Sequence, residues 1–505
     1  MVKRVDQDDA TARDSATTLP RVLGPVSALC VVVGSVIGSG IFIVPATVAR
    51  HVPSTGMIVL VWVVGGLFSA AGALTLAELG GMLPRAGGPY VYLREAYGPL
   101  PAFLFGWTEF LVVRTGSMAT LAAAFARYFA QVWHAPAGIH PLVWQALAAI
   151  AAIVAVATIN IVGTKVGGSV QVAGTVLKVG ALVTLIALPF LIRGQAHLDN
   201  LRPVWPERFD ADLLKGFMLA MVGVLWAYDG WLNLSELAEE VREPGRNVPR
   251  ALILGIIVLI ALYVTMTVVY HTVLPMDEVR AASTEKGSER AVAADFCRHL
   301  LGSPGVLAIS LVVMCSTFIS LNGNALTGPR AYFAMARDGL FPETICRIHP
   351  RFQTPAHAVI AQASWAILLT LLGTALILSP PPASTSVLPQ PLVAAWDKLN
   401  KTPLYDVLYT YVIFGATIFY AASIASVFVL RRTRPDLHRP YQTWGYPVTP
   451  ALYIAAALIL LVSMYRENRF ESLAGLGIIA LGLPAYLFFA RRPHASPTAV
   501  EEPIP

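Results

Sequence analysis

The chain has 505 residues, of which 56% are hydrophobic and only 13% are Asp, Glu, Lys or Arg. Soluble domains carry about 25% charged residues and a single soluble core stops growing near about 250–300 residues, so this composition excludes a soluble protein of several domains. The formal net charge is +6. Because the basic residues lie between long apolar segments, the positive-inside rule accounts for them and no nucleic acid partner is predicted.

The chain opens with a polar tail, residues 1–21, whose composition is typical of a disordered segment. No short apolar core with a small-residue cleavage site marks a signal peptide. Twelve apolar segments follow, each about 20 residues or longer, which is the length needed to cross a bilayer as a helix. They are residues 22–50, 56–81, 99–131, 142–162, 168–192, 213–241, 250–274, 303–329, 356–379, 406–430, 447–465 and 470–490. We therefore expect an all-α membrane protein with 12 transmembrane helices and a second tail, residues 491–505.

The basic residues also predict the orientation of the chain. With the N-terminus inside, the inner segments hold more Lys and Arg than the outer loops, and the short segment 431–439 (RRTRPDLHR) is strongly basic. The positive-inside rule then predicts a multi-pass protein of the cell membrane with both termini in the cytoplasm.

Two apolar segments are interrupted near the middle. Residues 34–42 (GSVIGSGIF) break the first segment and residues 226–234 (WAYDGWLNL) break the sixth. Four segments follow each broken one, so the breaks take matching places in two five-helix repeats, 22–192 and 213–430, with two additional helices over 447–490. Interrupted segments at corresponding positions indicate the binding site of an inverted-repeat transporter.

The breaks place polar backbone groups at membrane depth, where a non-helical backbone is tolerated only beside a cavity or inside protein. Amides at the start of the second half-helix can bind a carboxylate, and carbonyls before each break can accept hydrogen bonds from an ammonium group. Together they predict a site for an α-amino acid headgroup. The predicted substrate-binding residues are Val36, Ile37, Gly38, Ser39, Gly40, Ile41, Trp226, Ala227, Asp229 and Gly230. The alternative is that the glycines, including the GxxxG pair Gly34 and Gly38, only allow close helix packing.

Two charged residues inside the apolar segments suggest a mechanism. Lys178 lies in segment 168–192, where a lysine costs at least ~2.5–3.5 kcal/mol. Its ammonium can stand in for a bound sodium ion, or its side chain can snorkel to the surface. Asp229 lies in the second break, where it can contact substrate, carry a proton or cap the following half-helix.

Other charged residues are interpreted as structural. Glu109 and Arg114 are five residues apart, which is not the spacing of partners on a regular helix, so a structural pair and separate contacts both stay open. Glu78, Glu239 and Glu240 lie toward inner helix ends and are expected to anchor them or to serve as inner-gate partners of basic residues. The expected partners are Arg85, Arg246 and Arg250.

Other classes of function have little support. The cysteines show no CxxC spacing, so neither a disulfide nor a metal site is predicted; they are Cys30, Cys297, Cys315 and Cys346. The chain lacks HExxH, GxSxG and Walker motifs, which argues against an enzyme embedded in the membrane, and no cofactor is predicted. An amino acid receptor that binds without transporting stays open.

Several segments resemble the amino acid–polyamine–organocation (APC) superfamily, and within it the L-amino-acid transporter branch of bacterial exchangers and heteromeric-transporter light subunits. The similarity spans about residues 20–490. It is carried by VLGPVSALCVVVGSVIGSGIFIVP (22–45), by ALTLAELGGMLPRAGGPYVYLREAYGPLPAFLFGWTEFLVVR (73–114), by AYDGWLNLSELAEEVREPGRNVPRAL (227–252), by RAYFAMARDGLFP (330–342) and by LRRTRPDLHRPYQTWGYP (430–447).

The resemblance implies a core of two inverted five-helix repeats, alternating access and exchange of amino acids. It also implies that the amides of Ser39 and Gly40 bind the carboxylate, and that the carbonyls of Val36, Trp226 and Asp229 bind the amino group. Trp226 matches the family's aromatic gate. Lys178 matches a lysine that, in sodium-independent relatives, tethers helix 5 to helices 1 and 8.

The resemblance also bears on partners and coupling. Light subunits use a cysteine in the loop that corresponds to residues 132–141, and this loop has none, so we expect a functional monomer without a disulfide-linked heavy subunit. The predicted function is sodium-independent exchange of neutral L-amino acids, with proton-coupled symport as the alternative. Residues 380–405 form a longer loop than is usual in the family, and no purpose is predicted for it.

Overall fold

The computed structural model describes residues 18–192, 194–282, 292–379, 404–467 and 469–491. Over these residues the secondary structure is helical, apart from one isolated parallel bridge between Leu23 and Val241. Within the described part of the chain, twelve spans are long and apolar enough to cross a membrane, as predicted. Most of the predicted loop 380–405 and most of the two predicted tails lie outside the described residues.

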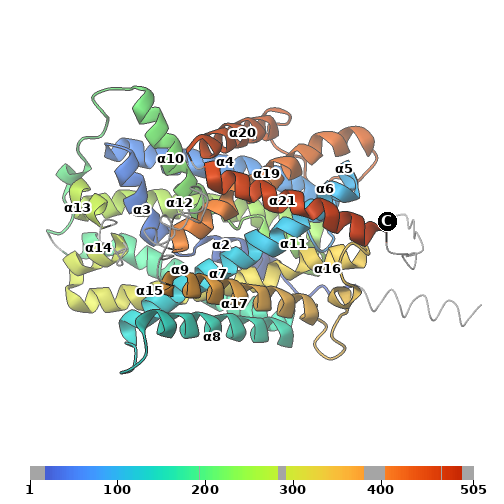
Figure 1. Ribbon diagram of the computed structural model, residues 1–505. Helices are drawn as coiled ribbons and strands as arrows, with labels where there is room; N and C mark the ends of the chain where they lie inside the picture. The colour runs from blue at the N-terminus through green and yellow to red at the C-terminus, as the bar shows by residue number, and fades with distance from the viewer. Residues whose placement is uncertain (1–17, 193, 283–291, 380–403, 468, 492–505) are drawn as a thin grey trace, which may run out of the picture.

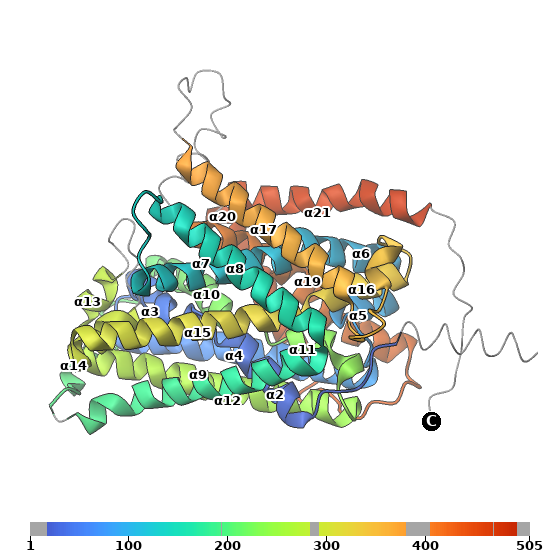
Figure 2. The same ribbon diagram turned by 90° about the horizontal axis from the view of Figure 1, so that it is seen from below.

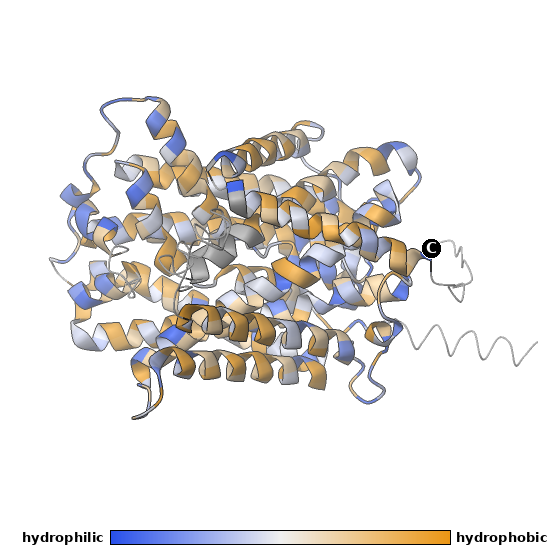
Figure 3. Ribbon diagram, viewed as in Figure 1, coloured by the Kyte–Doolittle hydropathy of each residue, from blue (hydrophilic) through white to orange (hydrophobic). Residues whose placement is uncertain are grey.

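The helices that form the spans run in chain order and are largely apolar along their length (Figures 1 and 3). They are α2 (Pro25–Val36), α3 (Gly40–His51), α4 (Thr55–Met82), α6 (Pro99–Thr108), α7 (Arg114–Val132), α8 (Pro141–Val162), α9 (Thr164–Leu191), α10 (Ala211–Tyr228), α12 (Pro244–Val273), α15 (Ser303–Thr327), α16 (Pro329–Arg337), α17 (Ala356–Leu378), α19 (Leu404–Thr433), α20 (Val448–Glu467) and α21 (Arg469–Ala490). Hydrophilic residues gather in the connections at both ends of the bundle (Figure 3). Most of the bounds fall within about four residues of the predicted ones.

The sixth predicted segment ends earlier than the hydropathy pattern suggests. It stops at Tyr228, and a short helix, α11 (Asn233–Glu236), and a 3-10 turn, η3 (Ala238–Glu240), carry the chain onward. Among the described residues, three further short α-helices lie in connections: α5 (Pro89–Tyr97), α13 (Met276–Ala281) and α14 (Val292–Leu301). Hydropathy misses helix α14 because its buried residues, among them Phe296 and Leu300, occupy one face only.

The broken first span lies in the middle of the bundle. Helix α2 packs against α9, α12 and α15, and α3 packs against α10. Figure 2 shows α9 beside α15. By contrast, α21 packs on α6 and α19 and is mostly exposed on the outside of the bundle (Figure 1). The core therefore positions the first break away from the lipid-facing surface.

The last residues of the predicted tail are ordered. Leu19 is buried against Ala86 and Phe333, and its backbone N–H donates to Glu239 Oε1 at 2.9 Å. Leu23 exchanges backbone hydrogen bonds with Glu240 and Arg242. The segment that precedes α2 is thus fixed to the turn that follows α11. The division into two repeats and two additional helices stays a prediction.

Candidate substrate site

The first break separates α2 from α3 by three residues, Ile37, Gly38 and Ser39. Helix α2 ends when Ile37 takes a ψ of 87°, and α3 begins at Gly40. The first amides of α3, those of Gly40 and Ile41 among them, lack an earlier turn whose carbonyls could accept their hydrogen bonds. This helix end therefore offers donors and a positive dipole end inside the bundle.

The second break follows α10. Asp229 is extended, with ψ of 150°, and Gly230 has a φ of 110°, a conformation that favours glycine. A Cβ atom on Gly230 would lie 3.3 Å from the carbonyl carbon of Ser35, and one on Gly40 would lie 2.7 Å from Ala227 Cα. The two breaks are therefore in direct contact, and glycines permit that contact on both sides.

The alternative interpretation was that Gly34 and Gly38 only allow close helix packing. It holds for Gly34. A Cβ atom on Gly34 would lie 2.0 Å from Thr175 Oγ1 and 2.6 Å from Gln171 Nε2, so this glycine lets α2 pack tightly on α9. A Cβ atom on Gly38 would meet its nearest neighbours, among them Ser320, at ordinary distances of 3.5 Å and more. Gly38 is therefore not required by helix packing.

Lys178 is buried and reaches the first break from α9, so it does not snorkel to the surface. Its Nζ donates to the carbonyl oxygen of Gly34 at 2.7 Å, to the carbonyl oxygen of Ile37, and to Ser320 Oγ at 3.1 Å. Since Ser320 belongs to α15, the ammonium ties α9 to α2 and α15. These are the helices that the predicted tether joins.

Two serines of α15 also hold the break, and the sequence analysis missed both. Ser316 Oγ donates to the carbonyl oxygens of Ile37 at 3.0 Å and Gly38 at 3.1 Å, and Ser320 Oγ donates to that of Ile37 at 2.9 Å. With Lys178, three donors converge on the Ile37 carbonyl. The sequence could have indicated the two serines, because residues four apart lie on the same face of an otherwise apolar helix.

Two other carbonyls that were predicted to accept from the substrate's amino group each accept a hydrogen bond from within the protein. The carbonyl oxygen of Val36 accepts from Tyr263 Oη at 3.1 Å, and that of Trp226 accepts from the backbone N–H of Asp229 at 3.1 Å. A carbonyl oxygen has two lone pairs, so the Val36 carbonyl can accept a further hydrogen bond. The Ile37 carbonyl, with three donors, is saturated in this conformation.

A cavity lies between the two breaks and is lined by residues from both. It includes most of the predicted substrate-binding residues, but not Ile37, Ile41 or the predicted coupling residue Lys178. The lining consists of Ser35, Val36, Gly38, Ser39, Gly40, Val113, Arg114, Ser117, Leu121, Trp226, Ala227, Asp229, Gly230, Asn233, Ser320 and Asn324. The backbone around the break and a few polar side chains thus line a small space between the two breaks, where a small molecule can bind.

Arg114, interpreted from the sequence as structural, lines this cavity. Its Nε lies 2.9 Å from Glu109 Oε2, its Nη1 donates to Asn233 Oδ1 at 2.7 Å, and its Nη2 donates to Glu236 Oε1 at 2.6 Å. The five residues Glu109–Val113 form a π-helix, in which residues five apart are neighbours. The π-helix therefore brings Glu109 and Arg114 together as a pair, and Arg114 also makes separate contacts with Asn233 and Glu236.

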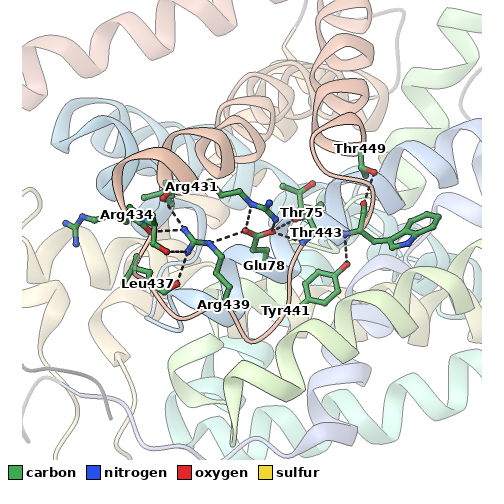
Figure 4. Close-up of polar contacts among 12 residues, drawn as sticks. Thr75, Glu78, Arg431, Arg434, Leu437, Arg439, Tyr441, Thr443 and Thr449 are labelled. Carbon is green, nitrogen blue, oxygen red and sulfur yellow. Dashed lines mark hydrogen bonds and ion pairs between the residues drawn. The ribbon is translucent and has the colours of Figure 1, made fainter.

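The arginine partners expected for the inner acidic residues are wrong. Glu78, at the end of α4, accepts from Arg431 at 2.9 and 2.7 Å and from Thr443 N and Oγ1 at 2.7 Å each (Figure 4). Arg439 lies 3.5 Å from the same carboxylate. Arg431 lies in the last turn of α19 and the other two partners follow this helix, about 350 residues later in the chain. Nothing in the local spacing could have indicated them.

Glu239 and Glu240 also bind other partners than the predicted arginines. Glu239 pairs with Arg337 at 3.2 Å and accepts from the Ala86 amide at 2.9 Å. Glu240 forms a fully buried pair with Arg330 at 2.7 Å. Both pairs join the segment after α11 to α16, so they are anchors at the predicted cytoplasmic end.

Comparison with known proteins agrees with this architecture. A profile of the amino acid permease family matches residues 23–475. The b(0,+)-type amino acid transporter 1 of Homo sapiens is 30% identical over 99% of this chain and 95% of its own length. The serine/threonine exchanger SteT of Bacillus subtilis (strain 168) is 29% identical over 94% of this chain and 98% of its own length. The cystine/glutamate transporter of Homo sapiens is 28% identical over 93% of this chain and 85% of its own length.

These matches cover nearly the whole chain, including both breaks and the surrounding helices. The chain therefore belongs to the amino acid permease family of the APC superfamily, and it is a multi-pass membrane protein.

Proposed function

We propose that this member of the amino acid permease family is a secondary active transporter that exchanges neutral L-amino acids without sodium, by alternating access. The family and the names of its relatives, among them an exchanger from Bacillus subtilis, support amino acid exchange. The inverted repeats, 22–192 and 213–430, are part of the same proposal.

The headgroup of the substrate binds between the two breaks. The amides of Ser39, Gly40 and Ile41, at the N-terminus of α3, take its carboxylate, and the carbonyls of Val36 and Trp226 take its amino group. Support comes from the cavity, which lies against Ser39, Gly40, Val36 and Trp226. A site built from backbone recognises the part that all amino acids share, so a range of side chains fits this mode of binding.

The observation that carries sodium independence is the position of the Lys178 ammonium. It lies on the carbonyl oxygens of Gly34 and Ile37 and on the hydroxyl of Ser320, which are the kinds of ligand that hold an alkali or alkaline-earth cation in a protein. Because a tethered ammonium already neutralises these oxygens, the transport cycle needs no dissociable sodium ion at this point.

The test is counterflow into proteoliposomes preloaded with amino acid, with a panel of labelled amino acids and with sodium present or replaced by choline. We expect uptake that internal amino acid stimulates and that choline replacement leaves unchanged. Uptake that requires a sodium gradient and shows no stimulation by internal substrate would contradict the proposal.

Proton-coupled symport is the second candidate, and Asp229 is the observation that favours it. Its side chain lines the cavity and accepts a hydrogen bond from Tyr420 Oη at 3.2 Å. A carboxylate in contact with the substrate space can bind and release a proton. Concentrative uptake driven by a pH gradient into liposomes without internal amino acid would select this candidate over exchange.

The proposal extends to partners and orientation. The loop 132–141 contains no cysteine, so we propose a functional monomer without a disulfide-linked heavy subunit. The excess of basic residues in the inner segments supports a cell-membrane protein with both termini in the cytoplasm.

A further inference from the structure

Outside the two breaks, most of the cavity lining belongs to α7 and α15, which pack against each other. Helix α7 contributes Arg114, Ser117 and Leu121, and α15 contributes Ser320 and Asn324. When the headgroup of an amino acid is bound to the backbone of the two breaks, which is the part that rests on the proposed function, its side chain meets this wall. Because the cavity is small, the chemistry of the wall decides which side chains are accepted.

Asn324 presents an amide group to this cavity. The residue is 4% exposed, and its Oδ1 accepts a hydrogen bond from Gln362 Nε2 at 2.7 Å. Its Nδ2 donates to no residue that the structure describes, although the side chain lines the substrate space. A buried N–H group that lacks an acceptor is costly, so this amide favours a bound molecule that supplies an acceptor atom.

Gln362, on α17, determines which end of the Asn324 amide faces the cavity. Gln362 Nε2 also lies 3.3 Å from the backbone carbonyl oxygen of Asn324 and 3.7 Å from Met118 Sδ. Both of these atoms are acceptors, so the nitrogen end of the Gln362 amide fits this position and its oxygen does not. The Asn324 atom that contacts this nitrogen is therefore the oxygen, and the NH₂ group of Asn324 is left for the cavity.

Ser117, on α7, supplies a second polar group to the wall. It is 7% exposed and lines the same cavity, and its hydroxyl forms no hydrogen bond within the described part of the chain. A hydroxyl group can both donate and accept. Ser117 can therefore also bind an oxygen that accepts from Asn324, with or without a proton on that oxygen.

A side-chain carboxylate is the wrong acceptor for this wall. Arg114 already lies 2.9 Å from Glu109 and 2.6 Å from Glu236, and Asp229 also lines the cavity. A further negative charge would meet these carboxylates without solvent to screen it. The acceptor that suits Asn324 is therefore the oxygen of a neutral group, such as a hydroxyl or an amide.

We propose that Asn324, oriented by Gln362, is a specificity-determining residue that selects neutral amino acids whose side chain carries an oxygen. Asn324 Nδ2 donates a hydrogen bond to this oxygen. An aliphatic side chain of the same shape leaves the amide buried and unpaired. A site that is built to hydrogen-bond a substrate oxygen discriminates strongly against the analogue that lacks it.

Binding of isosteric amino acid pairs to the purified protein tests the proposal. Threonine and valine differ by a hydroxyl in place of a methyl group, and O-methylserine and norvaline differ by an ether oxygen in place of a methylene group. Since an ether oxygen accepts but cannot donate, the second pair reports on the donor of Asn324 alone. We expect the wild type to bind the oxygen-containing member of each pair at least about tenfold more tightly, measured by titration of its thermal stability with each amino acid.

Three variants assign this preference to its residues. Asn324→Leu removes the donor at similar volume, so both affinity ratios should fall to about one while norvaline binds at least as well as before. Gln362→Leu frees the Asn324 amide to turn, and it should lower the preference for O-methylserine without weakening norvaline, which a merely structural role would not do. Thr317→Val is the matched control on α15 and should keep both wild-type ratios, because the Thr317 hydroxyl bonds within its own helix and does not line the cavity.

A wild type that binds both members of each pair equally overturns the proposal, and this result needs no variant. A preference for threonine without one for O-methylserine also overturns it, because the wall would then present an acceptor. Wild-type ratios in a folded Asn324→Leu overturn it equally, and wild-type ratios in Gln362→Leu overturn the role of Gln362. Because binding needs no transport, a protein that shows both preferences but exchanges no amino acid contradicts only the proposed function. Counterflow that treats threonine and valine alike contradicts only the specificity.

Discussion

At the scale of single residues, substitution of Lys178 should reduce transport without preventing the protein from folding. Lys178→Ala removes the donor shared by Gly34, Ile37 and Ser320, and hydrogen bonds to a charged group contribute about 1.5–3 kcal/mol each. Ser316 and Ser320 still hold the Ile37 carbonyl, so the fold persists while the break loses its fixed geometry. We expect counterflow to fall at least about tenfold, a change of ~1.4 kcal/mol, in protein that inserts normally.

Two further variants isolate the charge of Lys178. Lys178→Met keeps most of the side-chain volume and should lose as much counterflow as Lys178→Ala. Lys165→Ala, on the exposed face of the same helix α9, should exchange at the wild-type rate. Wild-type exchange by a correctly inserted Lys178→Ala would exclude a role for this ammonium in the transport cycle.

Gly40 allows a prediction that rests on the contact between the two breaks. The structure directs a Cβ atom at this position onto Ala227, 2.7 Å from both its Cα and Cβ. Gly40→Val therefore forces the two breaks apart. Overpacking of this kind costs about 1–3 kcal/mol, so we expect at least about tenfold weaker binding of amino acid, measured by radioligand binding in detergent.

The control for this substitution is Gly180→Val in α9, where a Cβ atom meets nothing within 4 Å. It introduces the same residue type into a helix of the same bundle and should leave the affinity unchanged. Equal affinity of Gly40→Val and the wild type would show that the substrate does not bind between these breaks.

At the scale of helices, the end of α4 depends on a segment far along the chain. The Glu78 carboxylate holds Arg431 and Thr443 (Figure 4), and Arg431 stacks on Tyr446 at 3.7 Å. Removing one partner of a buried pair costs about 3–5 kcal/mol, which we reduce to about 2–3 kcal/mol because the Arg431 side chain is 22% exposed. Glu78→Gln should therefore lower the unfolding temperature in detergent by several degrees.

An exposed pair in the same region provides the comparison. Arg434 lies 3.5 Å from Glu95, and its side chain is 53% exposed, so Arg434→Gln should change the free energy of unfolding by less than about 1 kcal/mol. If the two variants unfold at the same temperature, the Glu78 network does not hold α4 to the segment after α19.

The helices also show what local sequence can and cannot predict. The spans follow from hydropathy because the thickness of the bilayer fixes their length, and the breaks follow from Gly38, Gly40 and Gly230 at membrane depth. The pairing of Glu109 with Arg114 does not follow, because it needs a π-helix that the spacing of a regular helix excludes. Nor does the role of Ser316, because its partners, Ile37 and Gly38, lie in the first break, about 280 residues earlier in the sequence.

At the scale of the whole molecule, the contacts at one end identify loops that share a side of the membrane. Glu78 joins the end of α4 to the segment after α19, and Glu239 joins the segments around Leu19, Ala86 and Arg337. The basic segment 431–439 belongs to this end, so we predict from the positive-inside rule that this end faces the cytoplasm. The same prediction places the loop 132–141, at the other end of α7, outside.

Cysteine labelling of intact cells tests this orientation. Ala137→Cys and Asp436→Cys place thiols at exposed positions of the two ends. We expect a membrane-impermeant maleimide to label Ala137→Cys in intact cells and Asp436→Cys only after permeabilisation, with the parent chain setting the background of the native cysteines. If Asp436→Cys is labelled in intact cells and Ala137→Cys is not, the orientation is the opposite one and the basic segment lies outside the cell.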